Sequence, residues 1–170
     1  MADWESIVRT HGAMAFDTAW RLLGHAADTE DAAQEALLEA FRLHGRQPVR
    51  NWGGLVRHLA TRRAIDRLRQ RRTVLPLRRE MPMSVPASEQ PESIAAVREL
   101  ADRLRSAIAK LPEREASVFS LRYLGEMDNS QIAETLGISV AAVGVALHKA
   151  RNRLKQLLGL QNVTARRSRS

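Results

Sequence analysis

The chain contains no cysteine, few aromatic residues and no long apolar run. The absence of cysteine excludes disulfides, thiol catalysis and cysteine-based zinc sites. Aromatic residues are only 4% of the 170 residues, which favours compact helical units over a β-sandwich. No apolar run approaches the roughly 20 residues of a membrane span, and the first residues lack the basic and apolar regions of a secretory signal peptide. We therefore expect a cytoplasmic protein.

Charge and histidine pattern limit the function classes further. The net charge is +8, which indicates a polyanionic partner. Nucleic acid is favoured over a membrane because the sequence has no lipid-anchor motif. The five histidines are scattered and form neither H-x-x-x-H nor H-E-x-x-H, so we expect no metal site, no cofactor and no enzymatic activity.

The clearest pattern is a pair of helices joined by a tight turn between residues 127 and 158. Asp128 and Gln131 are spaced as a capping box, Gly137 follows the first apolar stripe, and Ser139 is a good N-cap for the second helix. This spacing is typical of a helix-turn-helix, although an ordinary helical hairpin with a solvated basic face also fits it. The apolar stripe expected on the second helix is Val143, Leu147, Ala150, Leu154 and Leu157.

Three helices are expected in the first half, over residues 3–23, 28–43 and 55–72. The second begins with several acids, which suit a helix N-terminus but would repel DNA, so a basic protein surface is the better partner. The third carries seven arginines and one acid, Asp66. A solvated helix face usually mixes signs, so this composition favours contact with phosphates.

A tryptophan lies in the expected loop over residues 44–54, which Pro48 and the pair Gly53–Gly54 mark as irregular. Trp52 is suited to stacking on an unpaired base. Packing back over the neighbouring helices explains it equally well.

Residues 74–91 hold four of the six prolines and lose all helical periodicity, which indicates a linker. The helical pattern returns at Glu92 with an apolar stripe. The predicted fold is therefore all-α, with two small helical bundles over residues 1–73 and 92–160, joined by this Pro-rich linker and followed by a basic tail over residues 161–170. If residues 57–72 were instead buried against the helix-turn-helix, DNA binding would first require the two segments to separate. The apolar stripe after the linker is Ile94, Val97, Leu100, Leu104, Ile108 and Leu111.

The order of these parts resembles the extracytoplasmic-function (ECF) sigma factors of bacterial RNA polymerase, over residues 5–158. The acidic segment is DTEDAAQEALLEAF (28–41), the arginine-rich segment is ATRRAIDRLRQRR (60–72), and the third is LPEREASVFSLRYLGEMDNSQIAETLGIS (111–139). They are similar, in this order, to a pattern in region 2, to the region 2.3–2.4 helix and to region 4 of that family. The resemblance implies a σ2-like and a σ4-like bundle with no domain between them.

The resemblance also implies a function and partners. The chain would be a promoter-specificity subunit that binds core polymerase through the β′ clamp helices and the β flap. It would contact double-stranded promoter DNA and the melted −10 strand, and many family members also bind an anti-sigma factor. The residues implied for core polymerase are Asp28, Asp31, Gln34 and Glu35. Those implied for the −10 element are Trp52, Arg57, Arg62, Arg63, Arg67, Arg69 and Arg71. Those implied for the −35 element are Ser139, Ala141, Ala142, Val145, His148, Lys149, Arg151 and Arg153.

The recognition helix departs from the family in one respect. Residues 142–147 read AVGVAL, so side chains able to make bidentate bonds to base edges are nearly absent. We expect −35 readout to depend on phosphates and DNA shape. A linker of about 18 residues spans at most ~60 Å, and the two bundles add ~20–25 Å each. The two promoter elements lie ~70–85 Å apart, so the chain can bridge them only with the linker extended.

Other classes of protein share parts of this pattern. A helix-turn-helix regulator that never binds polymerase needs neither the acidic nor the arginine-rich helix. A nuclease could hold Mg²⁺ at Asp28, Glu30, Asp31 and Glu35, although helix capping and protein contact explain these acids better. An adaptor or anti-sigma protein is disfavoured because two separate helices are suited to DNA.

Overall fold

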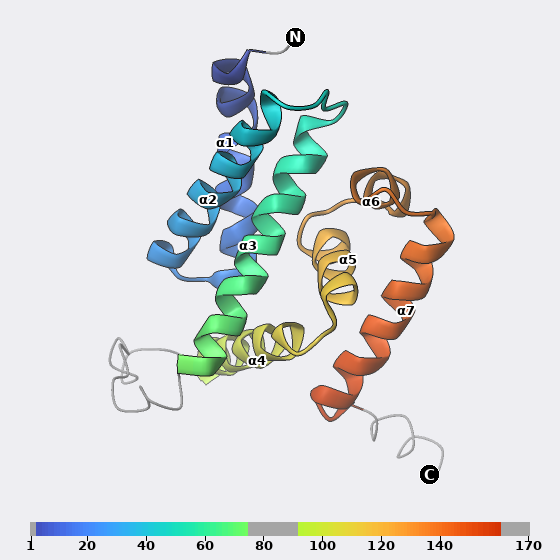
Figure 1. Ribbon diagram of the computed structural model, residues 1–170. Helices are drawn as coiled ribbons and strands as arrows, with labels where there is room; N and C mark the ends of the chain where they lie inside the picture. Colours follow the sequence, from blue (N-terminus) through green and yellow to red (C-terminus); the bar gives the residue numbers. More distant parts are fainter. Residues whose placement is uncertain (1–2, 75–91, 161–170) are drawn as a thin grey trace, which may run out of the picture.

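The computed structural model describes residues 3–74 and 92–160, and every regular element in these two ranges is a helix (Figure 1). The all-α prediction is confirmed. The expected linker, apart from its first residue, and the basic tail lie outside the described residues.

Helices α1 (Trp4–Leu23), α2 (Ala26–His44) and α3 (Trp52–Val74) pack against one another as a bundle, on the left of Figure 1. Small buried side chains such as Ala15, Ala36 and Ala60 form much of its core and let the helices approach closely. α1 ends at Gly24, as predicted, where the left-handed φ of 59° favours glycine.

The second group comprises α4 (Glu92–Ala109), α5 (Glu113–Tyr123), α6 (Asn129–Leu136) and α7 (Val140–Leu157). α6 and α7 meet at 106°, within the range of a helix-turn-helix. The predicted capping box is present, since Gln131 N donates to Asp128 Oδ1 at 2.8 Å and Asp128 N donates to Gln131 Oε1 at 2.9 Å. Gly137 has φ 64°, and Ser139 Oγ accepts a hydrogen bond from Ala142 N.

The two groups form one body with a shared core. α3 packs against α1 and α2 and also against α4, α5 and α6, so it lies at the centre of the molecule (Figure 1). Leu22 and Leu68 of the first group belong to the same buried cluster as Ile108 and Leu154 of the second. The second group thus packs against the arginine-rich helix, which is the arrangement for which the sequence analysis required a separating event before DNA binding.

Three details differ from the sequence predictions. Trp52 is the first residue of α3 rather than a loop residue, because Asn51 Oδ1 accepts a hydrogen bond from Gly54 N and caps the helix there. Of the stripe on α4, Ile94, Val97 and Leu100 are exposed, since only the last turns of α4 reach the shared core. Leu157 at the end of α7 is also exposed.

Among the described helices, none is by itself long and apolar enough to cross a membrane. α6 and α7 satisfy that criterion only together, as a sharply bent pair, and only by length and composition.

Candidate nucleic-acid interface

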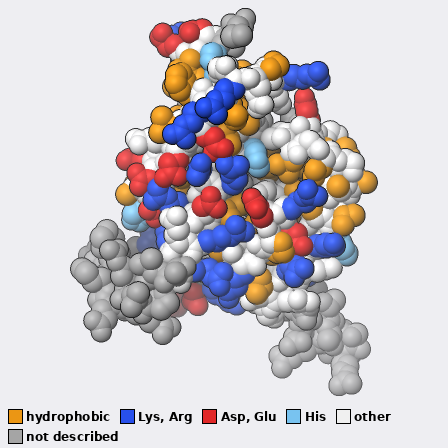
Figure 2. All heavy atoms as spheres, viewed as in Figure 1, with side chains coloured by type: hydrophobic (Ala, Val, Ile, Leu, Met, Phe, Trp, Pro, Cys, Tyr) orange, Lys and Arg blue, Asp and Glu red, His pale blue; other side chains and the backbone are white. Residues whose placement is uncertain are grey.

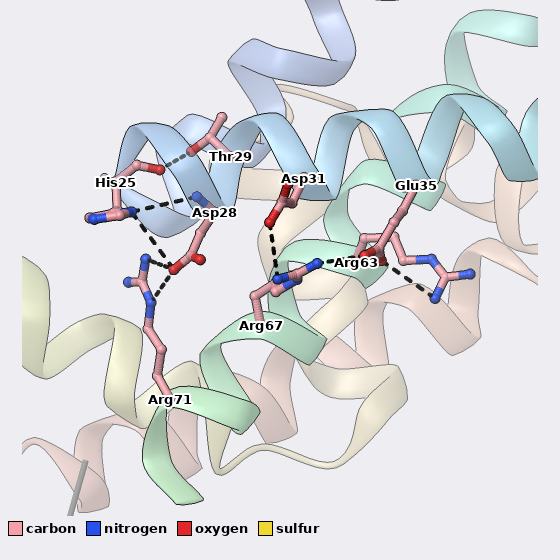
Figure 3. A network of polar contacts seen from close by, with 8 residues as sticks. All are labelled: His25, Asp28, Thr29, Asp31, Glu35, Arg63, Arg67 and Arg71. Carbon is pink, nitrogen blue, oxygen red and sulfur yellow. Dashed lines mark hydrogen bonds and ion pairs between the residues drawn. The ribbon is translucent and has the colours of Figure 1, made fainter. Parts of the chain in front are cut away.

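An ion-pair ladder joins α2 to α3, which run antiparallel (Figure 3). The acids of α2 recur at a spacing of three or four residues, and Arg63, Arg67 and Arg71 of α3 recur every four residues, so each set forms one stripe. The two stripes face each other. The ladder comprises Asp28, Asp31, Glu35 and Glu39 on α2 and Arg62, Arg63, Arg67 and Arg71 on α3.

The ion pairs of the ladder follow α2 from Asp28, near its start, to Glu39. Arg71 Nε donates to Asp28 Oδ2 at 2.7 Å near the start of α2. One turn further, Arg67 Nη2 donates to Glu35 Oε1 at 2.5 Å and Arg67 Nη1 to Asp31 Oδ2 at 3.4 Å. The hydrogen bond to Glu35 raises the pKa of Arg67, against the effect of burial. These contacts fix both helices relative to each other.

The last rung contains a residue that the sequence reasoning missed. Glu39 accepts a hydrogen bond from Arg62 Nη2 at Oε1 and another from Arg63 Nη2 at Oε2, both at 2.7 Å. Burial of the carboxyl tends to raise its pKa, but the bonds from Arg63 and Arg62 and their charges hold the pKa of Glu39 below its ordinary value. The spacing of Glu39 from Asp28, Asp31 and Glu35 was the available signal, because it continues their stripe.

The ladder brings together two sets of residues that the resemblance assigns to different partners. Most residues implied for polymerase pair with residues implied for −10 DNA. Figure 2 accordingly shows basic and acidic side chains interleaved on the visible face. The arginine face of α3 is therefore not of one sign in the folded molecule. Asp28, Asp31 and Glu35, which we also weighed as Mg²⁺ ligands, each face an arginine.

The remaining predicted residues of these two helices lie apart from the ladder. Gln34 is exposed on α2, and Arg57 is half-buried on α3. Arg69 Nη2 donates to the backbone oxygen of Leu111 at 3.0 Å, which ties α3 to the second group.

Trp52 lines a pocket of about 730 Å³ formed with the loop after α2. Its ring also lies 6.5 Å from that of Trp4 and 5.6 Å from that of His44, between centroids. Trp52 thus packs back on the helices, as one interpretation expected, and it also lines the pocket, while stacking on a base stays a prediction. Arg46 and Arg50, which the sequence reasoning did not assign, line the same pocket.

The predicted −35 residues follow α7 from its N-cap. Ala141, Val145, His148 and Lys149 are exposed, and Ala142 is half-buried. The basic residues nearer the end of α7 have partners on α5. Arg151 Nε donates to the Tyr123 hydroxyl at 2.7 Å, and Arg153 Nε lies 2.9 Å from Oε2 of the buried Glu115.

The seam between the two groups is held by arginines that donate to carbonyls at helix ends. Arg105 Nε of α4 donates to Leu22 O at 2.9 Å, and Arg21 Nη1 of α1 donates to Leu124 O at 2.7 Å. These carbonyls would otherwise lack partners within their helices. The arginines therefore stabilise the contact between the groups.

A half-buried histidine also lies at this seam. His58 of α3 lines a pocket of about 340 Å³ together with Glu113, Leu136 and Ile138 of the second group. Burial lowers the pKa of His58, and the nearby Arg62 lowers it further. Neutral His58 is thus favoured while the groups are in contact.

Comparison with known proteins identifies the family. The family model for sigma-70 region 2 matches residues 7–74, and that for sigma-70 region 4 matches residues 101–154. An RNA polymerase sigma-E factor from Streptomyces antibioticus is 30% identical over 173 residues, covering 96% of this chain and 89% of the relative. The ECF RNA polymerase sigma factor SigW from Bacillus subtilis is 28% identical over 153 residues, covering 84% of this chain and 82% of SigW. This chain belongs to the ECF sigma factors of the sigma-70 family.

The region boundaries agree with the helices of this sigma factor. Region 2 corresponds to α1–α3, and region 4 corresponds to the later part of α4 through α7. A crystal structure of the sigma factor RpoE from Bartonella quintana, in complex with the anti-sigma factor NepR, has a similar fold. Its TM-score is 0.54 at 17% identity, over 95% of this chain and 99% of that one.

Proposed function

We propose that this sigma factor docks on core RNA polymerase through α2, holds the −10 element with α3 and the Trp52 pocket, and contacts the −35 element with α7. The observation that carries the proposal is the presence in one chain of region 2 and region 4, each with an exposed surface suited to its partner. A helix-turn-helix regulator acting alone would have no use for region 2.

The polymerase-binding surface is proposed on the outer side of α2. Leu38 is 57% exposed and Phe41 52% exposed, and both follow Gln34 at helical spacing, so they continue its face. Exposed apolar side chains beside acidic ones fit a protein partner with basic and apolar groups. This combination supports the assignment of Asp28, Asp31, Gln34 and Glu35 to the β′ clamp helices.

The pocket at the start of α3 is proposed to receive a base of the melted −10 strand. Trp52 offers an aromatic surface for stacking, and Arg46 and Arg50 supply positive charge for the adjacent phosphates. Arg57, Arg62, Arg63, Arg67, Arg69 and Arg71 would continue the contact along α3.

Region 4 is proposed to read the −35 element with little direct recognition of bases. Ala141 and Val145 can meet only apolar groups such as a thymine methyl, whereas Lys149 can reach phosphates. Arg151 and Arg153 are held by Tyr123 and Glu115, so they would meet the backbone from fixed positions.

Simultaneous use of both surfaces requires the two groups to separate. The −10 and −35 elements lie ~70–85 Å apart, whereas here regions 2 and 4 share a core. We propose that core polymerase binding separates them. An anti-sigma factor is a further proposed partner, by analogy with NepR bound to RpoE of Bartonella quintana.

The experiment is reconstitution with purified core polymerase, followed by run-off transcription of genomic DNA. Binding to core polymerase and discrete transcripts are expected. A regulator that acts alone would not bind core polymerase, and that result would overturn the proposal.

A substitution on α2 tests whether this helix forms the polymerase-binding surface. Gln34 lies outside the ion-pair ladder, so Gln34→Lys should weaken core binding by tenfold or more without loosening α2 from α3. Gln156→Lys, the same change on an exposed position of α7, is the control and should bind normally. Equal affinity for the two variants would contradict the assignment to α2.

A further inference from the structure

We propose that Glu39 is a positioning residue that sets how much positive charge α3 presents to DNA phosphates. This inference rests on the proposed binding of α3 to promoter DNA, and it deepens that function. Glu39 would act only through Arg62 and Arg63, without contacting DNA itself.

The first support is the geometry of the three side chains. Each carboxylate oxygen of Glu39 accepts from one guanidinium at 2.7 Å, so neither oxygen is shared. Glu39 is 21% exposed, whereas Arg62 is 34% and Arg63 31% exposed. The Glu39 side chain is therefore more covered than the two arginine side chains that it holds, and both arginine side chains remain partly exposed to solvent.

A phosphate approaching from solvent can contact the exposed parts of Arg62 and Arg63 without displacing Glu39. Each arginine has five N–H donors, and Glu39 occupies one on each. Glu35 Oε2 also lies 3.9 Å from Arg63 Nη1, so an approaching phosphate experiences both acids, and Glu39 contributes one negative charge to the cluster. Glu39 thus orients both arginines and reduces their combined attraction for DNA.

The second support is the contrast with Asp31 and Glu35, the two most exposed acids of the ladder. Asp31 is 55% and Glu35 41% exposed, so a basic protein surface can reach them. Glu39 is more covered, and its pKa is held below the ordinary value, so it remains ionised at neutral pH. Its effect on Arg62 and Arg63 would therefore persist when polymerase engages α2.

The consequence is measurable as a salt dependence. The logarithm of DNA affinity falls with the logarithm of salt concentration, with a slope of about 0.9 per neutralised phosphate for duplex and about 0.7 for single strands. Removing the Glu39 charge should let the cluster neutralise about one more phosphate. Glu39→Gln keeps the shape and a hydrogen-bond acceptor while removing that charge.

The experiment measures promoter binding by the full-length chain in complex with core polymerase, over a series of salt concentrations. Glu39→Gln should bind more tightly at low salt, with a slope steeper by about 0.7–0.9. Glu39→Asp, which keeps the charge, should resemble the wild type. Glu99→Gln, at an exposed acid of α4, controls for net charge alone and should leave the slope unchanged.

A double variant separates charge from folding defects. Glu39→Gln combined with Arg62→Gln removes one charge of each sign, so the net charge of the cluster and the salt slope should return to their wild-type values. A purely structural role would instead make the double variant as defective as the single ones or worse.

An unchanged or shallower slope for Glu39→Gln would overturn the inference, as would identical behaviour of the Gln and Asp variants. Failure of the proposed function looks different, because the wild-type complex itself would then not form or would not bind promoter DNA.

Discussion

At the scale of single residues, two glycines of the helix-turn-helix should respond to alanine in opposite directions. Gly137 has a left-handed backbone, and a Cβ there meets no atom within 4 Å, so Gly137→Ala adds only backbone strain of about 1–2 kcal/mol. Gly144 lies inside α7 with equally open space, so Gly144→Ala should stabilise the protein by about 0.5–1 kcal/mol. Denaturant unfolding measures both, and changes of the same sign would contradict this account.

His58 should make stability sensitive to pH. Its pKa is lowered in the folded protein by burial and by Arg62, while Glu39 of α2 and Glu113 of α5 oppose that shift. Unfolded chains therefore bind a proton that the folded protein does not, once the pH falls below about 6.5. Stability should fall on acidification from pH 7.5 to 5.5, and His58→Gln should show a smaller fall than the wild type. The same substitution at the exposed His148 is the control, and an equal fall in wild type and His58→Gln would refute the role of His58.

Residue patterns within one helix were predictable, whereas pairings between helices were not. The caps at Asp128, Gly137 and Ser139 depend on neighbours three or four positions away, so spacing alone indicated them. Glu39 and His58 acquire their roles from residues more than twenty positions distant or in the other group. Local spacing places Glu39 on the acidic stripe of α2, but it does not indicate which residues of α3 pair with it.

At the scale of helices, α7 should contribute little to the recognition of individual bases in the −35 element. Its exposed N-terminal side carries Ala141 and Val145, and neither makes hydrogen bonds to base edges. Single substitutions in the −35 element should therefore each cost less than about 1 kcal/mol, below the usual 1–3 kcal/mol. Lys149→Ala should instead weaken binding to all sequences alike and lower the salt slope by about 1. Losses of several kcal/mol at individual bases would show that direct readout survives.

The helices themselves followed from periodicity, but their surroundings did not. The stripe on α4 satisfies the helical repeat, yet Ile94, Val97 and Leu100 are exposed because only the end of α4 enters the core. On α3, the arginines suggested a face of one sign, and the stripe that neutralises them lies on α2. Charge composition of one helix cannot reveal the charge of the helix packed against it.

At the scale of the whole molecule, regions 2 and 4 share one core, with α3 between them. The sequence predicted two bundles and the need for a separating event if α3 proved to be covered. The sequence could not predict that region 4 packs over α3. That contact depends on side chains such as Arg21, Arg69 and Arg105, which donate to carbonyls of the other group. The same contacts explain how the two proposed DNA-binding surfaces can be kept too close together to span a promoter.

The distance between α1 and α7, with and without core polymerase, tests this account most directly. The absence of native cysteine allows labels at Glu5→Cys and Gln156→Cys, two exposed positions. The free protein should give one short distance distribution, and the complex with core polymerase should give a clearly longer one, as simultaneous contact with the −10 and −35 elements demands. An unchanged distribution in a complex that has formed would contradict the account.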